Sequence, residues 1–80
     1  MAVTVYTKDF CPQCNRVKSA LDKGGLEYEE APIDERVLTL ARIKGWKAAP
    51  IVVSDVHPEC SFSGAQPHQI EAFIIKHKEG

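Results

Sequence analysis

The sequence predicts an α/β fold in which the elements follow the order β-α-β-α-β-β-α. Short runs rich in β-branched and aromatic residues alternate with longer stretches whose apolar residues recur at helical spacing. Glycine and proline stand at most of the boundaries between these segments. If the first two strands pair in parallel, their connection is a right-handed crossover, and the third strand can pair with the fourth as a hairpin. We therefore expect a four-stranded mixed sheet flanked by three helices.

The first two elements are a strand and a helix. Residues 2–7 predict a strand that is apolar on both faces and therefore central in the sheet. Residues 11–23 predict a helix, and Gly24-Gly25 ends it because glycine adopts the left-handed conformation after a helix easily. The residues of this helix that we expect to face inward are Val17, Ala20 and Leu21.

The next two elements are again a strand and a helix. Apolar and polar residues alternate over residues 26–30, which predicts a strand. Asp34 is placed to cap the following helix, with Ile33 and Leu38 at the positions of a hydrophobic staple. Gly45 is expected to end this helix. Its predicted buried side consists of Val37, Leu38, Leu40, Ala41 and Ile43.

The last part of the chain predicts two strands and a helix. Residues 51–53 form a short buried strand, residues 54–59 a turn, and residues 60–62 a returning strand. Pro67 is expected in the first turn of the last helix, where its missing N–H has no partner to lose. The side chains of this helix that we expect to face inward are Ile70, Phe73 and Ile74.

Two cysteines stand at the start of the first predicted helix, in the sequence Cys11-Pro12-Gln13-Cys14. Residues three apart in a helix have β-carbons about 5–6 Å apart, and a disulfide needs about 3.5–4.5 Å, so a small adjustment closes or opens the bond. The free N–H groups of the helix start favour a negative charge and should lower the pKa of Cys11. Lys8 can add a positive charge nearby. This pattern favours a reversible dithiol/disulfide couple.

Two other interpretations of the cysteines remain open. A CxxC pair is often half of a zinc site, and His57 and Cys60 offer a second half with the same spacing. However, residues 15–56 separate the two pairs, whereas ribbon-type zinc sites usually have about 15–20 residues between them. A module that holds zinc or an iron–sulfur cluster through Cys11 therefore stays an alternative, as do inert structural cysteines.

Composition and charge exclude several classes of function. The 80 residues make one domain, residues 1–80, and the hydrophobic fraction of 44% indicates an ordered fold. The net charge of −1 indicates no nucleic-acid partner, and no apolar run is long enough to cross a membrane. The chain lacks a signal-peptide pattern, and an odd number of cysteines, three, argues against a secreted disulfide scaffold. We expect a cytoplasmic monomer.

A few other side chains are interpreted as structural. Trp46, in a loop, is expected to cover the core, and Tyr6 is expected to belong to the core. Cys60 is interpreted as a small strand residue without a role in turnover. The three histidines, which we expect on the solvated surface, are His57, His68 and His77.

Three segments resemble the thioredoxin superfamily in its short glutaredoxin-like form: T-K-D-F-C-P-Q-C at residues 7–14, A-P-I-V-V at 49–53 and F-S-G-A-Q-P at 62–67. The resemblance implies a thioredoxin fold with a cis Ala49–Pro50 bond facing the CxxC pair. It also implies that Cys11 attacks a substrate disulfide, that Cys14 resolves the mixed disulfide, and that the backbone at Ala49 pairs with the substrate. The expected partner-binding residues are Lys8, Pro12, Gln13, Ala49, Pro50, Ser63 and Gly64.

Within this superfamily the chain is similar both to glutaredoxins and to NrdH-type redoxins. Gln13 before the second cysteine and the stretch containing Ser63, Gly64 and Pro67 favour the NrdH type, although Phe62, Ala65 and Gln66 depart from its usual W-S-G-F-R-P. Glutaredoxins place an acidic residue at the start of the last helix to bind the ammonium group of glutathione, and residues 65–69 contain none. The resemblance thus implies reduction by thioredoxin reductase, which uses NADPH, and electron donation to the large subunit of class Ib ribonucleotide reductase. It implies no resident cofactor or metal.

Overall fold

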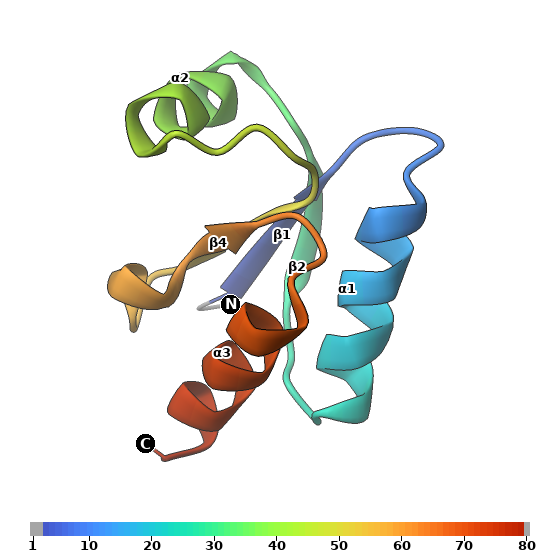
Figure 1. Cartoon of the computed structure of the whole chain (residues 1–80), viewed down its shortest axis with the longest axis vertical. Helices are drawn as coiled ribbons and strands as arrows, with labels where there is room; N and C mark the ends of the chain where they lie inside the picture. The colour runs from blue at the N-terminus through green and yellow to red at the C-terminus, as the bar shows by residue number, and fades with distance from the viewer. Residues whose placement is uncertain (1–2, 80) are drawn as a thin grey trace.

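The computed structural model describes residues 3–79 and contains one four-stranded sheet with helices on both faces (Figure 1). Residue 2 of the predicted first strand lies outside the described residues. The elements in chain order are β1 (Val3–Thr7), α1 (Pro12–Lys23), β2 (Glu29–Pro32), α2 (Glu35–Lys44), β3 (Ile51–Ser54), a 3₁₀ turn η1 (Pro58–Cys60), β4 (Phe62–Ser63) and α3 (Pro67–Glu79). The predicted order and fold class are therefore confirmed.

The sheet has the strand order β2-β1-β3-β4. β1 pairs with β2 in parallel and with β3 in antiparallel, and β3 pairs with β4 in antiparallel. β1 is thus central, as its apolar sequence predicted. The β1–β3 register places Val5 opposite Val52, and both side chains are fully buried.

Two apolar clusters lie on opposite faces of the sheet. The larger cluster joins the sheet to α1 and α3 and contains Val3, Val5, Val17, Leu21, Val52, Phe62, Ile70 and Phe73. The smaller cluster joins the sheet to α2 through Val37, Ala41 and Ile51, and Tyr6 and Trp46 pack against it as predicted. Burying an aliphatic or aromatic side chain of this kind stabilises a fold by about 1.5–3 kcal/mol, so the larger cluster carries most of the stability.

The ends of α2 follow the local signals in the sequence. The Asp34 carboxylate accepts a hydrogen bond from the Val37 N–H at 2.9 Å, and Gly45 ends the helix in the left-handed conformation at φ 75°. The predicted buried side of α2 is partly wrong, because Leu38 is 46% and Ile43 76% exposed. The smaller cluster covers only the side of the helix that carries Val37 and Ala41.

The second strand starts three residues later than predicted. The Leu26 N–H donates to the Leu21 carbonyl at 3.1 Å, so the chain first closes the end of α1. Leu26 and Tyr28 then pack against the larger cluster, and pairing with β1 begins at Glu29, opposite Thr4. The period-two pattern therefore reflects partial burial rather than strand pairing.

The returning strand is also shorter than predicted. Residues Pro58–Cys60 form a 3₁₀ turn in which the Cys60 N–H donates to the His57 carbonyl at 2.9 Å. Cys60 is partly buried against the larger cluster and forms no disulfide. Only Phe62 and Ser63 of the predicted stretch and its neighbour pair with β3.

None of the helices within residues 3–79 is long and apolar enough to cross a membrane.

The prediction of a solvated surface position is wrong for two of the three histidines. His77 is half-buried, and its ring nitrogens lie 2.7 Å from Ser54 Oγ and 2.7 Å from the Phe73 carbonyl oxygen. His57 is half-buried as well, with its ring centroid 5.1 Å from that of His77. His68 is exposed, as predicted.

Candidate redox site

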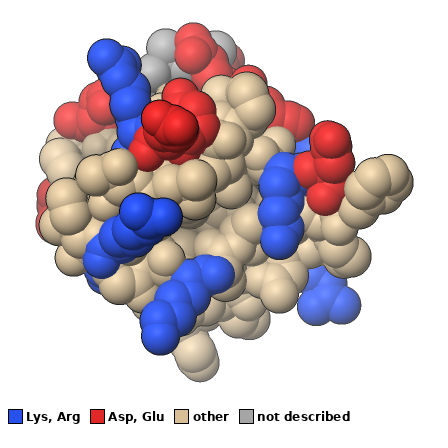
Figure 2. Space-filling view, turned by 90° about the horizontal axis from the view of Figure 1, so that it is seen from above, with Lys and Arg blue, Asp and Glu red and all other residues tan. Residues whose placement is uncertain are grey.

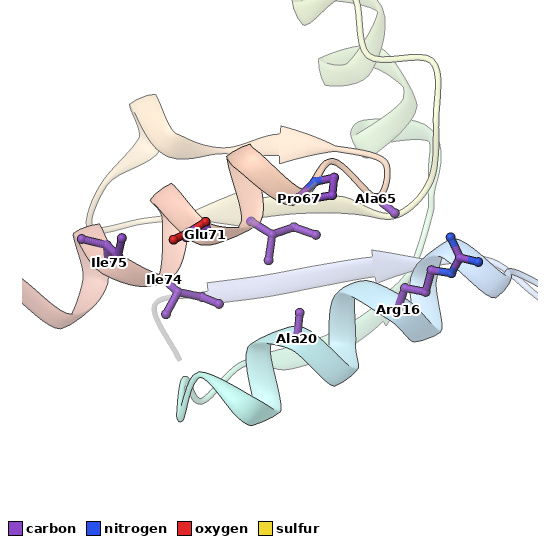
Figure 3. A pocket seen from close by; sticks show the side chains of 8 residues that line it. Arg16, Ala20, Ala65, Pro67, Glu71, Ile74 and Ile75 are labelled. Atoms are coloured by element: carbon purple, nitrogen blue, oxygen red, sulfur yellow. The ribbon is translucent and has the colours of Figure 1, made fainter.

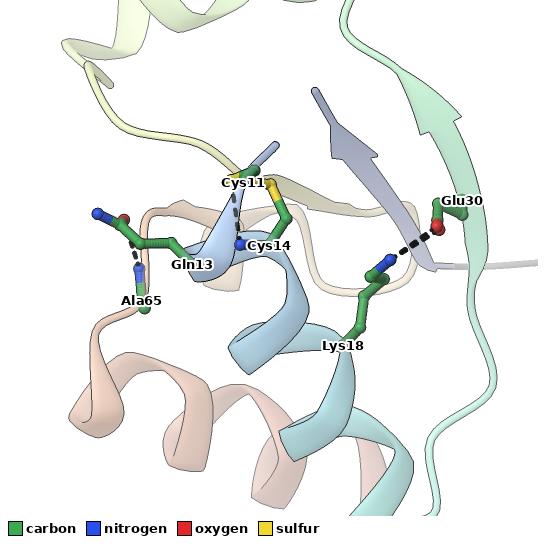
Figure 4. Close-up of a disulfide and its surroundings, with 6 residues drawn as sticks. All are labelled: Cys11, Gln13, Cys14, Lys18, Glu30 and Ala65. Carbon is green, nitrogen blue, oxygen red and sulfur yellow. Dashed lines mark hydrogen bonds and ion pairs between the residues drawn. A yellow bond between two sulfur atoms is a disulfide. The ribbon is translucent and has the colours of Figure 1, made fainter. Parts of the chain in front are cut away.

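The cysteine pair sits at the N-terminus of α1, at the end of the sheet where β1 stops. Cys11 is the N-cap residue with an extended backbone, φ −116° and ψ 96°, and Pro12 is the first residue of the helix. The Cys14 N–H donates to Cys11 Sγ at 3.1 Å (Figure 4). The Asn15 N–H donates to the Cys11 carbonyl at 3.3 Å. The sulfur of Cys11 therefore takes the place that a serine or aspartate oxygen takes in an ordinary helix cap.

Cys11 and Cys14 form a disulfide, with their Cα atoms 5.2 Å apart. Cys11 is 9% exposed and Cys14 only 2% exposed, as expected for the first turn of a helix that packs on the sheet. Cys11 is therefore the more exposed residue of the pair. The N–H groups of the first helical turn favour a negative charge at the position of Cys11.

The loop before β3 faces the cysteine pair. The Ala49–Pro50 bond is cis, as predicted, and Pro50 is fully buried. Lys8, Pro12, Gln13 and Ala49 line a shallow depression of about 350 Å³ together with Cys11. These are four of the residues that the sequence predicted for this site.

Pro50, Ser63 and Gly64 do not line the depression but support it from behind. The Gly64 N–H donates to the Pro50 carbonyl at 2.9 Å, which ties the β4–α3 loop to the cis-proline loop. Gly64 has φ 78°, and a Cβ at this position would lie 3.0 Å from Cβ of Ala48. Both facts favour glycine at this position.

Gln13 connects the cysteine turn with the loop that leads into α3. Its Oε1 accepts a hydrogen bond from the Ala65 N–H at 3.4 Å, across 52 residues of sequence (Figure 4). Gln66 Nε2 in turn donates to the Ser63 carbonyl at 2.7 Å. The β4–α3 loop is thus held by side-chain amides next to the site.

The depression is also lined by three residues that the sequence did not predict as site residues: Phe10, Lys47 and Ala48. Phe10 has φ 55° and a fully exposed side chain, at 101%. A positive φ is rare for a bulky residue and was invisible in the sequence. Lys47 could have been found from its place two residues before Ala49, a predicted partner-binding residue.

Comparison with known proteins agrees with this geometry. A sequence model of the Glutaredoxin family matches residues 3–58. The glutaredoxin-like protein NrdH of Lactococcus lactis is 34% identical over 70 residues, which cover 85% of this chain and 93% of the relative. The chain belongs to the glutaredoxin family, among its NrdH-type members.

Other NrdH-type proteins show the same likeness. The NrdH protein of Salmonella typhimurium is 33% identical over 73 residues, which cover 88% of this chain and 85% of that one. The solved structure of the NrdH-redoxin from Escherichia coli superimposes with a TM-score of 0.73 at 28% identity, covering 90% of this chain and 93% of that one. That protein is described as glutaredoxin-like, with a thioredoxin-like activity profile.

In this NrdH-type chain, Cys11 and Cys14 do not form a zinc site with His57 and Cys60. Nowhere in residues 3–79 do three or more His, Cys, Asp or Glu side chains gather as ligands of one metal ion. Cys60 packs against the larger apolar cluster, and His57 contacts His77 and Glu59. The CxxC pair and the pair His57 and Cys60 therefore make separate contacts.

An ion pair lies one helical turn behind the buried cysteine of this NrdH-type site. Lys18 Nζ lies 3.0 Å and 3.1 Å from the two carboxylate oxygens of Glu30, linking α1 to β2 (Figure 4). The side chains of Lys18 and Glu30 are 26% and 41% exposed. Partly exposed pairs of this kind contribute at most about 1 kcal/mol, so we assign this one to fixing the helix against the sheet edge.

Proposed function

We propose that this NrdH-type chain is a small dithiol/disulfide carrier that reduces disulfides of other proteins. The observation that carries the proposal is the redox pair itself. Cys11 and Cys14 form a disulfide at a helix N-terminus, with Cys11 the more exposed of the two residues. This geometry suits reversible exchange with a disulfide that approaches from outside.

The proposed cycle transfers two electrons in two exchange steps. The Cys11 thiolate attacks one sulfur of the substrate disulfide, forms a mixed disulfide and releases the other sulfur as a thiolate. The Cys14 thiol then loses its proton to solvent and attacks Cys11 Sγ, which closes the Cys11–Cys14 bond and releases the second substrate thiolate. The substrate is reduced to a dithiol, and the chain is oxidised to the disulfide.

In this proposal, the residues around Cys11 bind the partner. The backbone at Ala49, next to Pro50, pairs with the substrate segment, and Pro12 and Gln13 provide contact surface at the start of α1. Lys8 lies on the rim of the same depression and adds positive charge near the attacking sulfur. Ser63 and Gly64 hold the neighbouring loop through the bond from Gly64 to Pro50.

The proposed reductant is thioredoxin reductase rather than glutathione. The first turn of α3 carries no acidic residue that could bind the ammonium group of glutathione. The first carboxylate of α3 belongs to Glu71, which lines an apolar groove between α1 and α3 together with Arg16 (Figure 3). The thioredoxin-like activity profile ascribed to the Escherichia coli NrdH-redoxin supports the same choice.

The proposed acceptor is the large subunit of class Ib ribonucleotide reductase, which follows from membership of the NrdH type. In this scheme the chain works in the cytoplasm as a monomer. In the same scheme the cysteine pair carries the electrons, and NADPH acts indirectly, through the reductase.

The test compares two reducing systems on the same oxidised protein. We expect thioredoxin reductase with NADPH to reduce the Cys11–Cys14 disulfide efficiently, and glutathione with glutathione reductase to reduce it about fivefold more slowly, because the exposed ion pair that this helix start cannot make contributes up to about 1 kcal/mol. NADPH consumption at 340 nm measures both reactions. Efficient turnover with glutathione and none with thioredoxin reductase would instead identify a glutathione-dependent glutaredoxin.

A further inference from the structure

The depression beside Cys11 has an unusual distribution of charge. Its lining contains two lysines, Lys8 and Lys47, and no acidic side chain. Asp9 and Glu30 line a different depression, which shares only Lys8 with this one and extends along β2. Figure 2, which views the molecule from above, shows separate basic side chains across the face; most acidic side chains lie in the upper part of the view, and one lies at the right beside a basic side chain. A negatively charged partner is therefore favoured next to Cys11.

The depression continues away from Cys11 as an apolar groove. A second hollow of about 340 Å³ shares Lys8, Lys47, Ala48 and Ala49 with the first. It extends over apolar side chains that include Ile33, Leu38 and Trp46. The two hollows adjoin at the four shared residues, and together they reach from Cys11 to Trp46. Such a surface fits an extended chain segment rather than a compact ligand.

Phe10 lines the hollow that contains Cys11. Its side chain is fully exposed, and its backbone is held at φ 55°. This conformation costs a bulky residue about 1–2 kcal/mol relative to an ordinary one. Strained residues of this kind concentrate at binding sites, where the strain presents a side chain in a required position. The aromatic ring is thus displayed beside Cys11 rather than packed into the protein.

We propose that the surface formed by Phe10, Cys11, Lys8, Lys47 and Trp46 binds an extended, acidic, disulfide-bearing peptide segment. The lysines contact carboxylates that flank the disulfide, and Phe10 contacts an apolar side chain of the segment. The proposal rests on the proposed function, since the bound segment carries the disulfide that Cys11 attacks. It adds a substrate class, which is an acidic segment in preference to a basic one.

The test uses two synthetic peptides of equal length that contain one internal disulfide, flanked in one by glutamates and in the other by lysines. Pre-reduced protein is mixed with each peptide in a single turnover, and the oxidised protein is counted by mass spectrometry after acid quench. No reductase is needed. We expect the acidic peptide to react about fivefold faster at low ionic strength, and this advantage to vanish near 1 M salt, where screening acts over about 3 Å.

Two variants with the same net charge separate local binding from overall charge. Lys47→Glu should reverse the preference, whereas Lys23→Glu, at the far end of α1, should keep it. Reaction of neither peptide would contradict the proposed function. Equal rates for both peptides, or equal effects of the two variants, would overturn the acidic-segment proposal and leave the proposed function standing.

Phe10 is tested by Phe10→Gly, because glycine adopts φ 55° without strain. We expect both peptides to react more slowly, by about threefold or more, while the midpoint of urea unfolding stays equal or rises. Unchanged reaction rates would exclude Phe10 from the docking surface. A lowered unfolding midpoint would show that Phe10 has a structural role instead.

Discussion

Ser54 Oγ lies 2.7 Å from Nε2 of His77 and joins the end of β3 to α3. The Ser54 side chain is 1% exposed, and its oxygen also accepts the His57 N–H at 3.0 Å. Because the Phe73 carbonyl can only accept, the proton of neutral His77 lies on Nδ1, so Nε2 accepts from the Ser54 hydroxyl. One buried hydroxyl therefore satisfies two groups, the nearby His57 N–H and the ring of His77 on α3.

This relationship predicts that Ser54→Ala destabilises the fold. The substitution leaves His77 Nε2 and the His57 N–H without partners, which should lower the free energy of unfolding by about 1–3 kcal/mol in urea denaturation. Thr39→Ala, at an exposed position on α2, is the control and should change it by less than about 0.5 kcal/mol. If the two variants lose equal stability, Ser54 does not have this role.

A second prediction concerns the dependence of stability on pH. Burial raises the pKa of Tyr28 above its ordinary value, and the nearby Asp22, to which Tyr28 is hydrogen-bonded, adds to the rise. A raised pKa means that the folded protein keeps its phenol proton when the unfolded chain loses it. This contribution to stability is therefore complete below about pH 10 and is lost as the pH rises through the folded pKa.

The measurement is the urea unfolding midpoint between pH 8 and pH 11. We expect it to fall more steeply with pH in the unmodified protein than in Tyr28→Phe, which has no phenol proton to lose. Tyr6→Phe serves as the matched control and should keep the steep fall. Identical slopes for the unmodified protein and Tyr28→Phe would show that Tyr28 makes no such contribution.

A third prediction restores the carboxylate that the first turn of α3 lacks. His68→Asp places an acid at an exposed position in that turn, where the helix dipole also favours it. We expect glutathione-dependent reduction to rise by up to about fivefold, the effect of one exposed charge pair, and thioredoxin reductase-dependent reduction to change less. Ala72→Asp adds the same charge one turn later and should not favour glutathione. An equal gain in both variants would mean that the position of the charge is irrelevant.

The parts of the fold that the sequence predicted correctly depend on local chemistry. The cap at Asp34, the left-handed Gly45 and Pro12 at the first position of α1 each follow from the conformational preference of one residue. The cysteine pair belongs to the same class, because spacing and helix position suffice to bring its sulfurs together. The cis Ala49–Pro50 bond was predicted by family resemblance alone and is confirmed.

The parts that the sequence did not predict depend on tertiary contacts. Leu38 and Ile43 have the spacing of buried residues, but the smaller cluster covers only one side of α2. His77 was expected at the surface because the residues around it in the sequence do not predict its hydrogen bond to Ser54, 23 residues away. Phe10 lines the site through a backbone held at φ 55°, which its neighbours in the sequence do not predict. The roles assigned to Cys11 and Cys14 in turnover stay predictions.

The central claim is that Cys11 attacks and Cys14 resolves. The most direct measurement is intact mass spectrometry of Cys14→Ser and Cys11→Ser, both in a Cys60→Ser background so that one cysteine remains in each. After incubation with the acidic disulfide peptide, Cys14→Ser should carry a stable mixed disulfide at Cys11, because attack occurs and resolution does not. Cys11→Ser should carry almost none, because Cys14 is buried. Equal trapping by both variants, or trapping by Cys11→Ser alone, would contradict the assignment.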